Sequence, residues 1–153
     1  MKHLRLIMIS GGLMFLFCVG SCGKWFGESF YIYSIENQSN KIITPYKATW
    51  PGYMDTILPP KRPPSVTVQP GERYYFTSQV PYEEIFQQLP RDTMSFFFFD
   101  YEIFSSLDWE EIRDNRRFLK RYDFSLEDLK RLNWTVTYPP TEAMKDIKQF
   151  PPY

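Results

Sequence analysis

Histidine and cysteine are nearly absent from this chain of 153 residues, which has only His3, Cys18 and Cys22. Catalytic triads of the Ser-His-Asp and Cys-His types need an imidazole, and the usual zinc sites need imidazole or thiolate. A cleavage before Cys22 would remove His3 and Cys18, and would leave no histidine and no other thiol. The sequence therefore predicts no catalytic residue of these types, no metal site and no cofactor.

Long apolar runs and an excess of one charge are also missing. The longest apolar stretch, from Leu6 to Phe17, is interrupted by Ser10-Gly11-Gly12 and is shorter than the roughly 20 residues that a membrane-spanning helix needs. The chain has 18 basic and 18 acidic residues, so its overall charge implies no strongly charged partner.

The N-terminus has the three-part form of an export signal. Lys2 and Arg5 precede the apolar stretch, and small residues follow it. The signal ends in Val19-Gly20-Ser21-Cys22, which resembles the lipobox of bacterial lipoproteins, in which the cysteine is acylated and the signal is cut before it. The resemblance implies a signal peptide over 1–21, a lipidated tether over 22–29 and a single globular domain over 30–153. The alternative is an ordinary secretion signal that contains a cysteine by chance.

Four motifs in the C-terminal half point to a second resemblance. They are DWEEIRDN (108–115), LKRYD (119–123), SLEDL (125–129) and NWTVTYPP (133–140). Together they resemble a family of small uncharacterised lipoproteins of Bacteroides-type bacteria. This resemblance implies an outer-membrane location and assigns no activity. No acidic run follows Cys22, which favours the periplasmic face of the membrane over the cell surface.

Alternating patterns predict several strands and turns in the first two thirds of the chain. Residues 30–36 and 41–44 flank a turn-rich break and predict one hairpin. Residues 65–68 and 72–78 flank Pro70-Gly71, which fits the centre of a type II turn, and predict a second hairpin. Between the two hairpins, residues 59–64 read as an extended proline-rich spacer. Residues 81–86 predict one or two helical turns.

Four consecutive phenylalanines, Phe96 to Phe99, predict a central strand, because they put two rings on each face of a sheet. Helix starts at Asp108 and Ser125 would supply the cover for one face. Residues 133–138 predict a further strand, and the tail over 141–153 predicts a strap. The fold class is therefore α+β: a mainly antiparallel sheet or immunoglobulin-like sandwich with two short C-terminal helices covering one face.

Basic residues recur at three- and four-residue spacing over 113–121, which would gather them on one helical face. Acidic residues are interleaved with them, so this pattern indicates a solvated, ion-paired surface. The basic residues are Arg113, Arg116, Arg117, Lys120 and Arg121.

Three further groups of residues are candidates for sites. Asp55-Thr56-Ile57 and Asp92-Thr93-Met94 resemble the tripeptide at which Bacteroides-type bacteria O-glycosylate exported proteins, which makes Thr56 and Thr93 candidate acceptors. Aromatic residues make up 19% of the chain, and most should form the core. Tyr46, Trp50 and Tyr53 are the candidates for stacking on a sugar. A glycosidase needs two carboxylates about 5 to 9.5 Å apart, and the cluster that could supply them is Asp100, Glu102, Asp108, Glu110 and Glu111.

These patterns predict a lipid-anchored cell-envelope protein without enzymatic activity, acting as an accessory or interaction protein of the outer membrane. Its expected partners are membrane lipid, through acylated Cys22, and an envelope protein or a glycan. Nucleic acid is not expected in that compartment. The alternatives are a glycan-binding module of a polysaccharide-uptake system and, third, a small carboxylate-dependent hydrolase.

Overall fold

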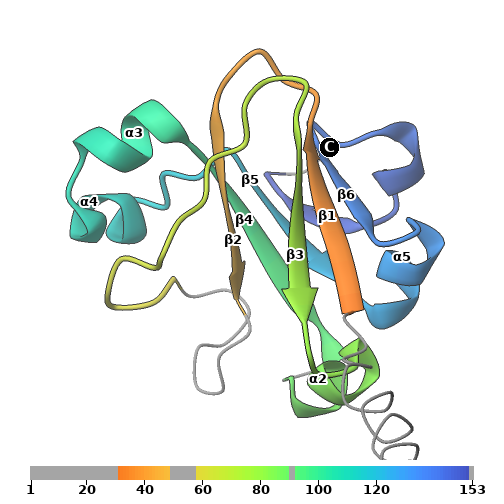
Figure 1. Cartoon of the computed structure of the whole chain (residues 1–153). Helices are drawn as coiled ribbons and strands as arrows, with labels where there is room; N and C mark the ends of the chain where they lie inside the picture. The colour runs from red at the N-terminus through yellow and green to blue at the C-terminus, as the bar shows by residue number, and fades with distance from the viewer. Residues whose placement is uncertain (1–30, 49–57, 90–91, 152–153) are drawn as a thin grey trace, which may run out of the picture.

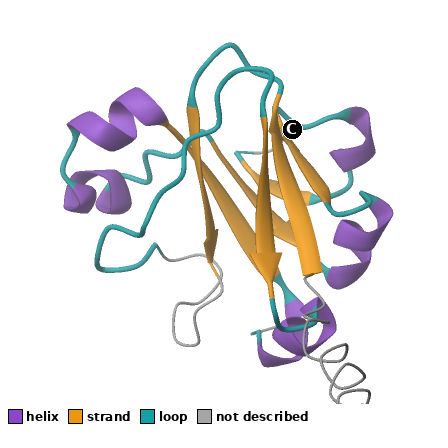
Figure 2. Cartoon of the chain, in the orientation of Figure 1, coloured by secondary structure: helices purple, strands orange, loops and turns teal. Residues whose placement is uncertain are grey.

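Two mostly antiparallel β-sheets form the body of the protein (Figures 1 and 2). The structure is a computed structural model and describes residues 31–48, 58–89 and 92–151. One sheet has three strands in the order β3-β1-β6, and the other has four in the order β2-β4-β5-β7. The strands are β1 (Tyr31–Asn37), β2 (Ile43–Ala48), β3 (Arg73–Ser78), β4 (Met94–Asp100), β5 (Lys120–Phe124), β6 (Thr135–Tyr138) and β7 (Lys148–Phe150).

Short helices surround the sheets. They are α2 (Tyr82–Gln88), α3 (Tyr101–Ser106), α4 (Trp109–Asp114), α5 (Leu126–Arg131) and the 3₁₀ turn η2 (Glu142–Met144). Among the described residues, no helix has the length and apolar character needed to cross a bilayer. The fold is α+β, with two sheets packed as a sandwich and short helices around them, as the sequence predicts.

The main core lies between the two sheets. Tyr33 of β1 meets Phe96 of β4 edge-on with ring centroids 5.3 Å apart, and Tyr138 of β6 stacks on Phe98 at 5.5 Å. Alternation explains this arrangement, because every second residue of a strand points to the same face. Ile35 and Val136, which are neighbours in the pairing of β1 with β6, fill the same layer.

The central strand β4 confirms the prediction made from its four phenylalanines. Phe96 and Phe98 face the inter-sheet core, whereas Phe97 and Phe99 belong to a second cluster on the opposite face. Every residue of β4 is buried. The sheet is therefore covered on both sides at this strand, as a continuous apolar run requires.

The helices that cover this outer face differ from the predicted pair. Phe104 of α3 and Trp109 of α4 contact Phe99, with centroids 5.2 and 6.0 Å apart. The helix that begins after Ser125 is α5, and its Leu129 is part of the inter-sheet core instead. The prediction that the helices beginning after Asp108 and Ser125 cover the same face was wrong. The helix that shares the outer face with α4 is α3, which directly follows β4.

Neither predicted hairpin forms. β1 and β2 lie in different sheets, because the turn between them crosses the sandwich and is held by Asn37. The Asn37 side-chain amide donates to the carbonyls of Lys41 at 2.7 Å and Val68 at 2.9 Å. Residues 65–68 form only a single bridge, Val68 to Ile43, and β3 pairs with β1.

The turn between these segments is nevertheless the predicted one. Gly71 has φ +77°, and the amide of Glu72 donates to the carbonyl of Gln69 at 3.0 Å. A positive φ at the third residue of a four-residue turn is typical of type II.

The basic stretch over 113–121 is not a helical face, so that interpretation was wrong. α4 ends at Asp114, and Lys120 and Arg121 belong to β5. The alternation of Tyr122 and Phe124, which both point into the inter-sheet core, explains why a strand forms here.

The proline-rich segment is a strap over α3 and α4, not a free spacer. The carbonyl of Pro59 accepts from the Trp109 indole at 2.7 Å, and that of Pro60 accepts from Arg113 at 3.2 Å. The Arg62 guanidinium donates to the carbonyls of Phe104 and Leu107 at the end of α3. The two bonds from Arg62 satisfy carbonyl acceptors at the end of α3 that would otherwise lack partners within the helix.

Candidate functional site

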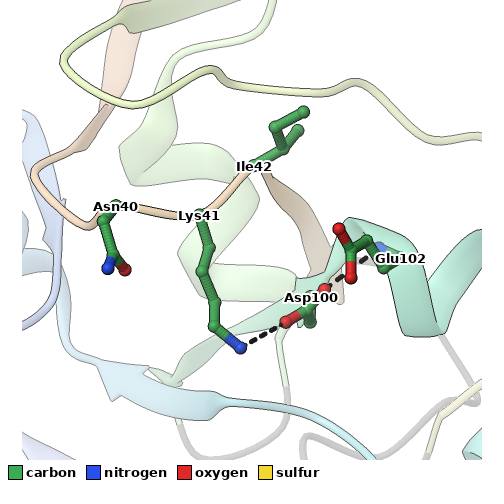
Figure 3. Close-up of a pocket in the computed structure, with 5 residues that line it drawn as sticks. All are labelled: Asn40, Lys41, Ile42, Asp100 and Glu102. Carbon is green, nitrogen blue, oxygen red and sulfur yellow. Dashed lines mark hydrogen bonds and ion pairs between the residues drawn. The ribbon is translucent and has the colours of Figure 1, made fainter.

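A small polar pocket lies where the turn between β1 and β2 meets the end of β4 (Figure 3). Its volume is about 200 Å³. Lys41 Nζ donates to Asp100 Oδ2 at 2.7 Å, and Asp100 Oδ1 accepts from the backbone amide of Glu102 at 3.0 Å. Asp100 thus caps α3 and pairs with Lys41 at the same time, and its two oxygens are both engaged. Asn40, Ile42 and Glu102 complete the lining.

These contacts fix the charge of the pocket. The hydrogen bond from Lys41 and those from backbone amides hold the pKa of Asp100 below its usual value, against the opposing effect of burial. The same bond raises the pKa of Lys41. Burial raises the pKa of the neighbouring Tyr138 hydroxyl. Asp100 is therefore an ionised, paired carboxylate at neutral pH. A glycosidase needs one carboxyl that stays protonated, and Asp100 does not fit that role.

The other predicted carboxylates do not join this pocket. Asp108 precedes α4 without a side-chain capping bond, and Glu111 pairs with Arg117 at 3.3 Å. Of the predicted cluster, the pocket brings together only Asp100 and Glu102. Within the ranges that the structure describes, no group of three or more acidic, histidine or cysteine side chains is arranged to hold a metal ion.

A larger groove, of about 400 Å³, lies between α2 and α5. Its apolar lining comes from Phe86 and Leu126, and Glu83, Asp92 and Glu127 contribute carboxylates. Gln87 and Ser125 complete the lining.

Lys130 of α5 bridges the two helices beside the groove. Its Nζ lies 3.3 Å from Glu83 Oε1 and 3.8 Å from Glu127 Oε1. Hydrogen bonds from the backbone and from Lys130 lower the pKa of Glu83. The α5 end of the groove is fixed by a capping box, in which Ser125 Oγ accepts from the Asp128 amide and the Asp128 carboxylate accepts from the Ser125 amide. The groove therefore has a mainly apolar lining with carboxylate-bearing residues at its rim.

No protein-family model, curated protein or solved structure matches this chain.

Of the six residues predicted for lipidation, O-glycosylation or glycan contact, the structure describes two. Tyr46 of β2 is half-buried, and its ring packs against Phe97 with centroids 6.2 Å apart. Thr93 is half-buried and lies between Asp92 and the start of β4. Its O-glycosylation stays a prediction. Four other predicted residues lie outside the described ranges: Cys22, Trp50, Tyr53 and Thr56.

The sequence reasoning missed an exposed apolar surface on the outer face of the three-stranded sheet. Ile32 of β1 is 50% exposed and Tyr75 of β3 is 60% exposed. They are diagonal neighbours, because Ile32 pairs with Thr77 and Ser34 pairs with Tyr75. The signal was present in Tyr74-Tyr75-Phe76, since three consecutive aromatic residues of a strand must put one ring on the opposite face from the other two.

A group of buried charges lies on the outer face of the four-stranded sheet. The Asp123 carboxylate accepts from Ser95 Oγ at 2.7 Å and from the Arg121 guanidinium at 2.9 Å. Lys148 Nζ is 3.4 Å from the same carboxylate. The Arg121 guanidinium also lies 4.0 Å from the centroid of the Phe150 ring, a distance typical of a cation–π contact. This network ties β4, β5 and β7 together, and the Asp123 carboxylate is shared by two cations, the buried Arg121 and the largely exposed Lys148.

Proposed function

We propose that this chain is a lipid-anchored protein of the cell envelope that acts without catalysis, as an accessory or interaction protein on the periplasmic face of the outer membrane. The observation that carries the proposal is Val19-Gly20-Ser21-Cys22 at the end of an export signal. Stable anchoring takes two lipid signals, and a cysteine acylated on both its thiol and its amino group supplies them.

The distance between Cys22 and the sandwich supports a close attachment. Eight residues separate Cys22 from Tyr31, the first residue of β1. The nine steps from Cys22 to Tyr31, at no more than about 3.5 Å each, span at most about 32 Å. The end of the sandwich at which β1 begins would therefore stay near the bilayer.

The outer face of the three-stranded sheet supports an interaction role. Figure 1 shows β3 and β1 without a helix in front of them, and Ile32 and Tyr75 are exposed there. Contiguous exposed apolar patches are typical of interaction surfaces. The paired state of Asp100 in the polar pocket also favours binding over acid catalysis.

The anchor is tested by replacing Cys22 with alanine in the full chain and following it through membrane fractionation. The Cys22→Ala protein should move to the soluble fraction and lose the mass of its acyl groups. Cys18→Ala is the matched control, because Cys18 lies inside the predicted signal, and this variant should fractionate like the unmodified chain. Retention of Cys22→Ala in the membrane with an unchanged mass would overturn the proposal.

Glycan binding is the second candidate, and the exposure of Tyr75 favours it. The exposed Thr77 belongs to the same face of the sheet, so a sugar ring could stack on Tyr75 and bond to the Thr77 hydroxyl beside it. Affinity electrophoresis in gels containing soluble polysaccharides tests this reading. The wild-type chain should be retarded and Tyr75→Ala should not, and equal mobility of both proteins in every gel would remove this candidate.

A further inference from the structure

The groove between α2 and α5 lies at the anchored end of the sandwich. α2 contacts the start of β1, where the Tyr82 hydroxyl donates to the Tyr31 carbonyl at 3.4 Å and the two rings meet edge-on at 6.3 Å. α5 joins α2 through the ion pair between Lys130 and Glu83. The polar pocket around Asp100 is at the opposite end of the strands, and Figure 1 shows α2 beside the place where β1 begins.

The groove combines a mainly apolar lining with exposed carboxylate residues at its rim. Phe86 and Leu126 provide apolar surface, and its volume of about 400 Å³ lies within the roughly 300–1,000 Å³ typical of ligand sites. Three carboxylates, those of Glu83, Asp92 and Glu127, line it, and Lys130 beside them contributes one positive charge. Among the residues that the structure describes there, three negative charges and one positive charge leave two in excess.

We propose that this groove is the docking site for a cationic amphipathic peptide segment of a partner protein. The segment would place an apolar side chain against Phe86 and Leu126, and its lysine or arginine side chains beside Asp92 and Glu127. The inference deepens the proposed interaction role by naming the chemistry of the partner, and it rests on that role.

The charge of the groove selects against other occupants. An acidic or purely apolar segment would leave carboxylates desolvated without a partner, which is costly. Anionic lipid headgroups would be repelled by the same carboxylates. Because the groove lies at the anchored end, the partner segment should itself lie close to the membrane surface.

The test is calorimetric titration of the full chain, held in phosphatidylcholine nanodiscs by its lipid anchor. The probe is a hexapeptide of alternating lysine and leucine, blocked at both ends, and the comparison peptide has glutamate in place of lysine. The lysine peptide should bind and the glutamate peptide should not, after the heat measured with empty nanodiscs is subtracted. If the chain is not lipidated, the same titration is done in buffer, so that loss of the anchor and loss of binding are separate results.

Variants locate the binding. Asp92→Asn with Glu127→Gln removes two carboxylates, and asparagine tolerates the positive φ of 49° at position 92. This double variant should bind the lysine peptide about three- to tenfold more weakly, because each charge pair at an exposed site is modest. Glu110→Gln with Asp146→Asn is the matched control, since it removes two exposed carboxylates away from the groove, and it should bind like the wild type.

Three results would overturn the proposal. They are the absence of binding at millimolar lysine peptide, equal binding of the two peptides, and equal weakening by the groove variant and the control variant. A separate substitution, Leu126→Gln, checks the apolar lining and should weaken binding while thermal unfolding confirms that the variant is folded. If Leu126→Gln is folded and binds as well as the wild type, the groove does not hold the apolar side chain of the peptide.

Discussion

The buried pair of Arg121 and Asp123 allows a sharp prediction about stability. The side chain of Asp123 is 1% exposed and that of Arg121 is 9% exposed, and the carboxylate accepts from both Ser95 and Arg121. Asp123→Asn keeps an oxygen that can accept from Ser95, and removes the charge that compensates Arg121. Breaking a buried ion pair by removing one partner costs about 3–5 kcal/mol, because the other charge stays buried without compensation.

The assay is urea unfolding of the full chain followed by tryptophan fluorescence. A protein of this kind has about 5–15 kcal/mol of total stability, so a loss of 3–5 kcal/mol should shift the midpoint strongly. Arg121→Met combined with Asp123→Asn removes both charges and keeps an oxygen that accepts from Ser95, so it should recover most of the loss. Because the double variant is expected to fold, the comparison stays informative even if Asp123→Asn is largely unfolded.

The control is Asp114→Asn, which removes a carboxylate that pairs with Arg113 at 2.7 Å on the surface. This pair is screened by solvent, so the unfolding midpoint should not move measurably. The reasoning would be refuted if Asp123→Asn lowered stability by less than about 1 kcal/mol, or if the double variant were no more stable than Asp123→Asn alone.

Two further predictions concern the polar pocket and the turn before β3. Because the pKa of Asp100 lies below the value of about 3.9 for an unfolded aspartate, its contribution to stability is present above that pH and is lost as the pH falls through the lowered folded pKa. Lys41→Met should therefore reduce the difference between urea midpoints measured at pH 5 and pH 3, and an unchanged difference would contradict the pairing. Gly71→Ala should lower the free energy of unfolding by about 1 kcal/mol, because the φ of +77° strains any residue with a Cβ, and a thermal midpoint equal to that of the wild type would exclude this strain.

Local patterns predicted the features that depend on one segment. The four phenylalanines of β4 required cover on both faces, and the structure supplies a sheet on one side and two helices on the other. The capping box at Ser125 and Asp128 forms as its spacing indicates. In both cases the neighbours along the chain carry all the information, because alternation and capping act over a few residues.

Long-range pairing was less predictable. The segments 30–36 and 41–44 have the pattern of a hairpin, and the buried Asn37 turns the chain from one sheet to the other instead. The strand β5 was not predicted, because its charged residues Lys120, Arg121 and Asp123 suggested a surface helix. Their burial depends on partners in β4 and β7, among them Ser95 and Lys148, which are far away in sequence.

The charge of the candidate groove shows the same limit of sequence reasoning most clearly. Equal numbers of basic and acidic residues indicated that no charged partner would be favoured. Folding separates these charges. Lys41 neutralises Asp100 at one end of the strands, whereas the described residues around the α2–α5 groove at the other end keep two carboxylates in excess. Electrostatic attraction between partners acts over about one Debye length, roughly 8 Å at physiological salt. The local excess, and not the net charge of the chain, therefore determines which segment could dock in the groove.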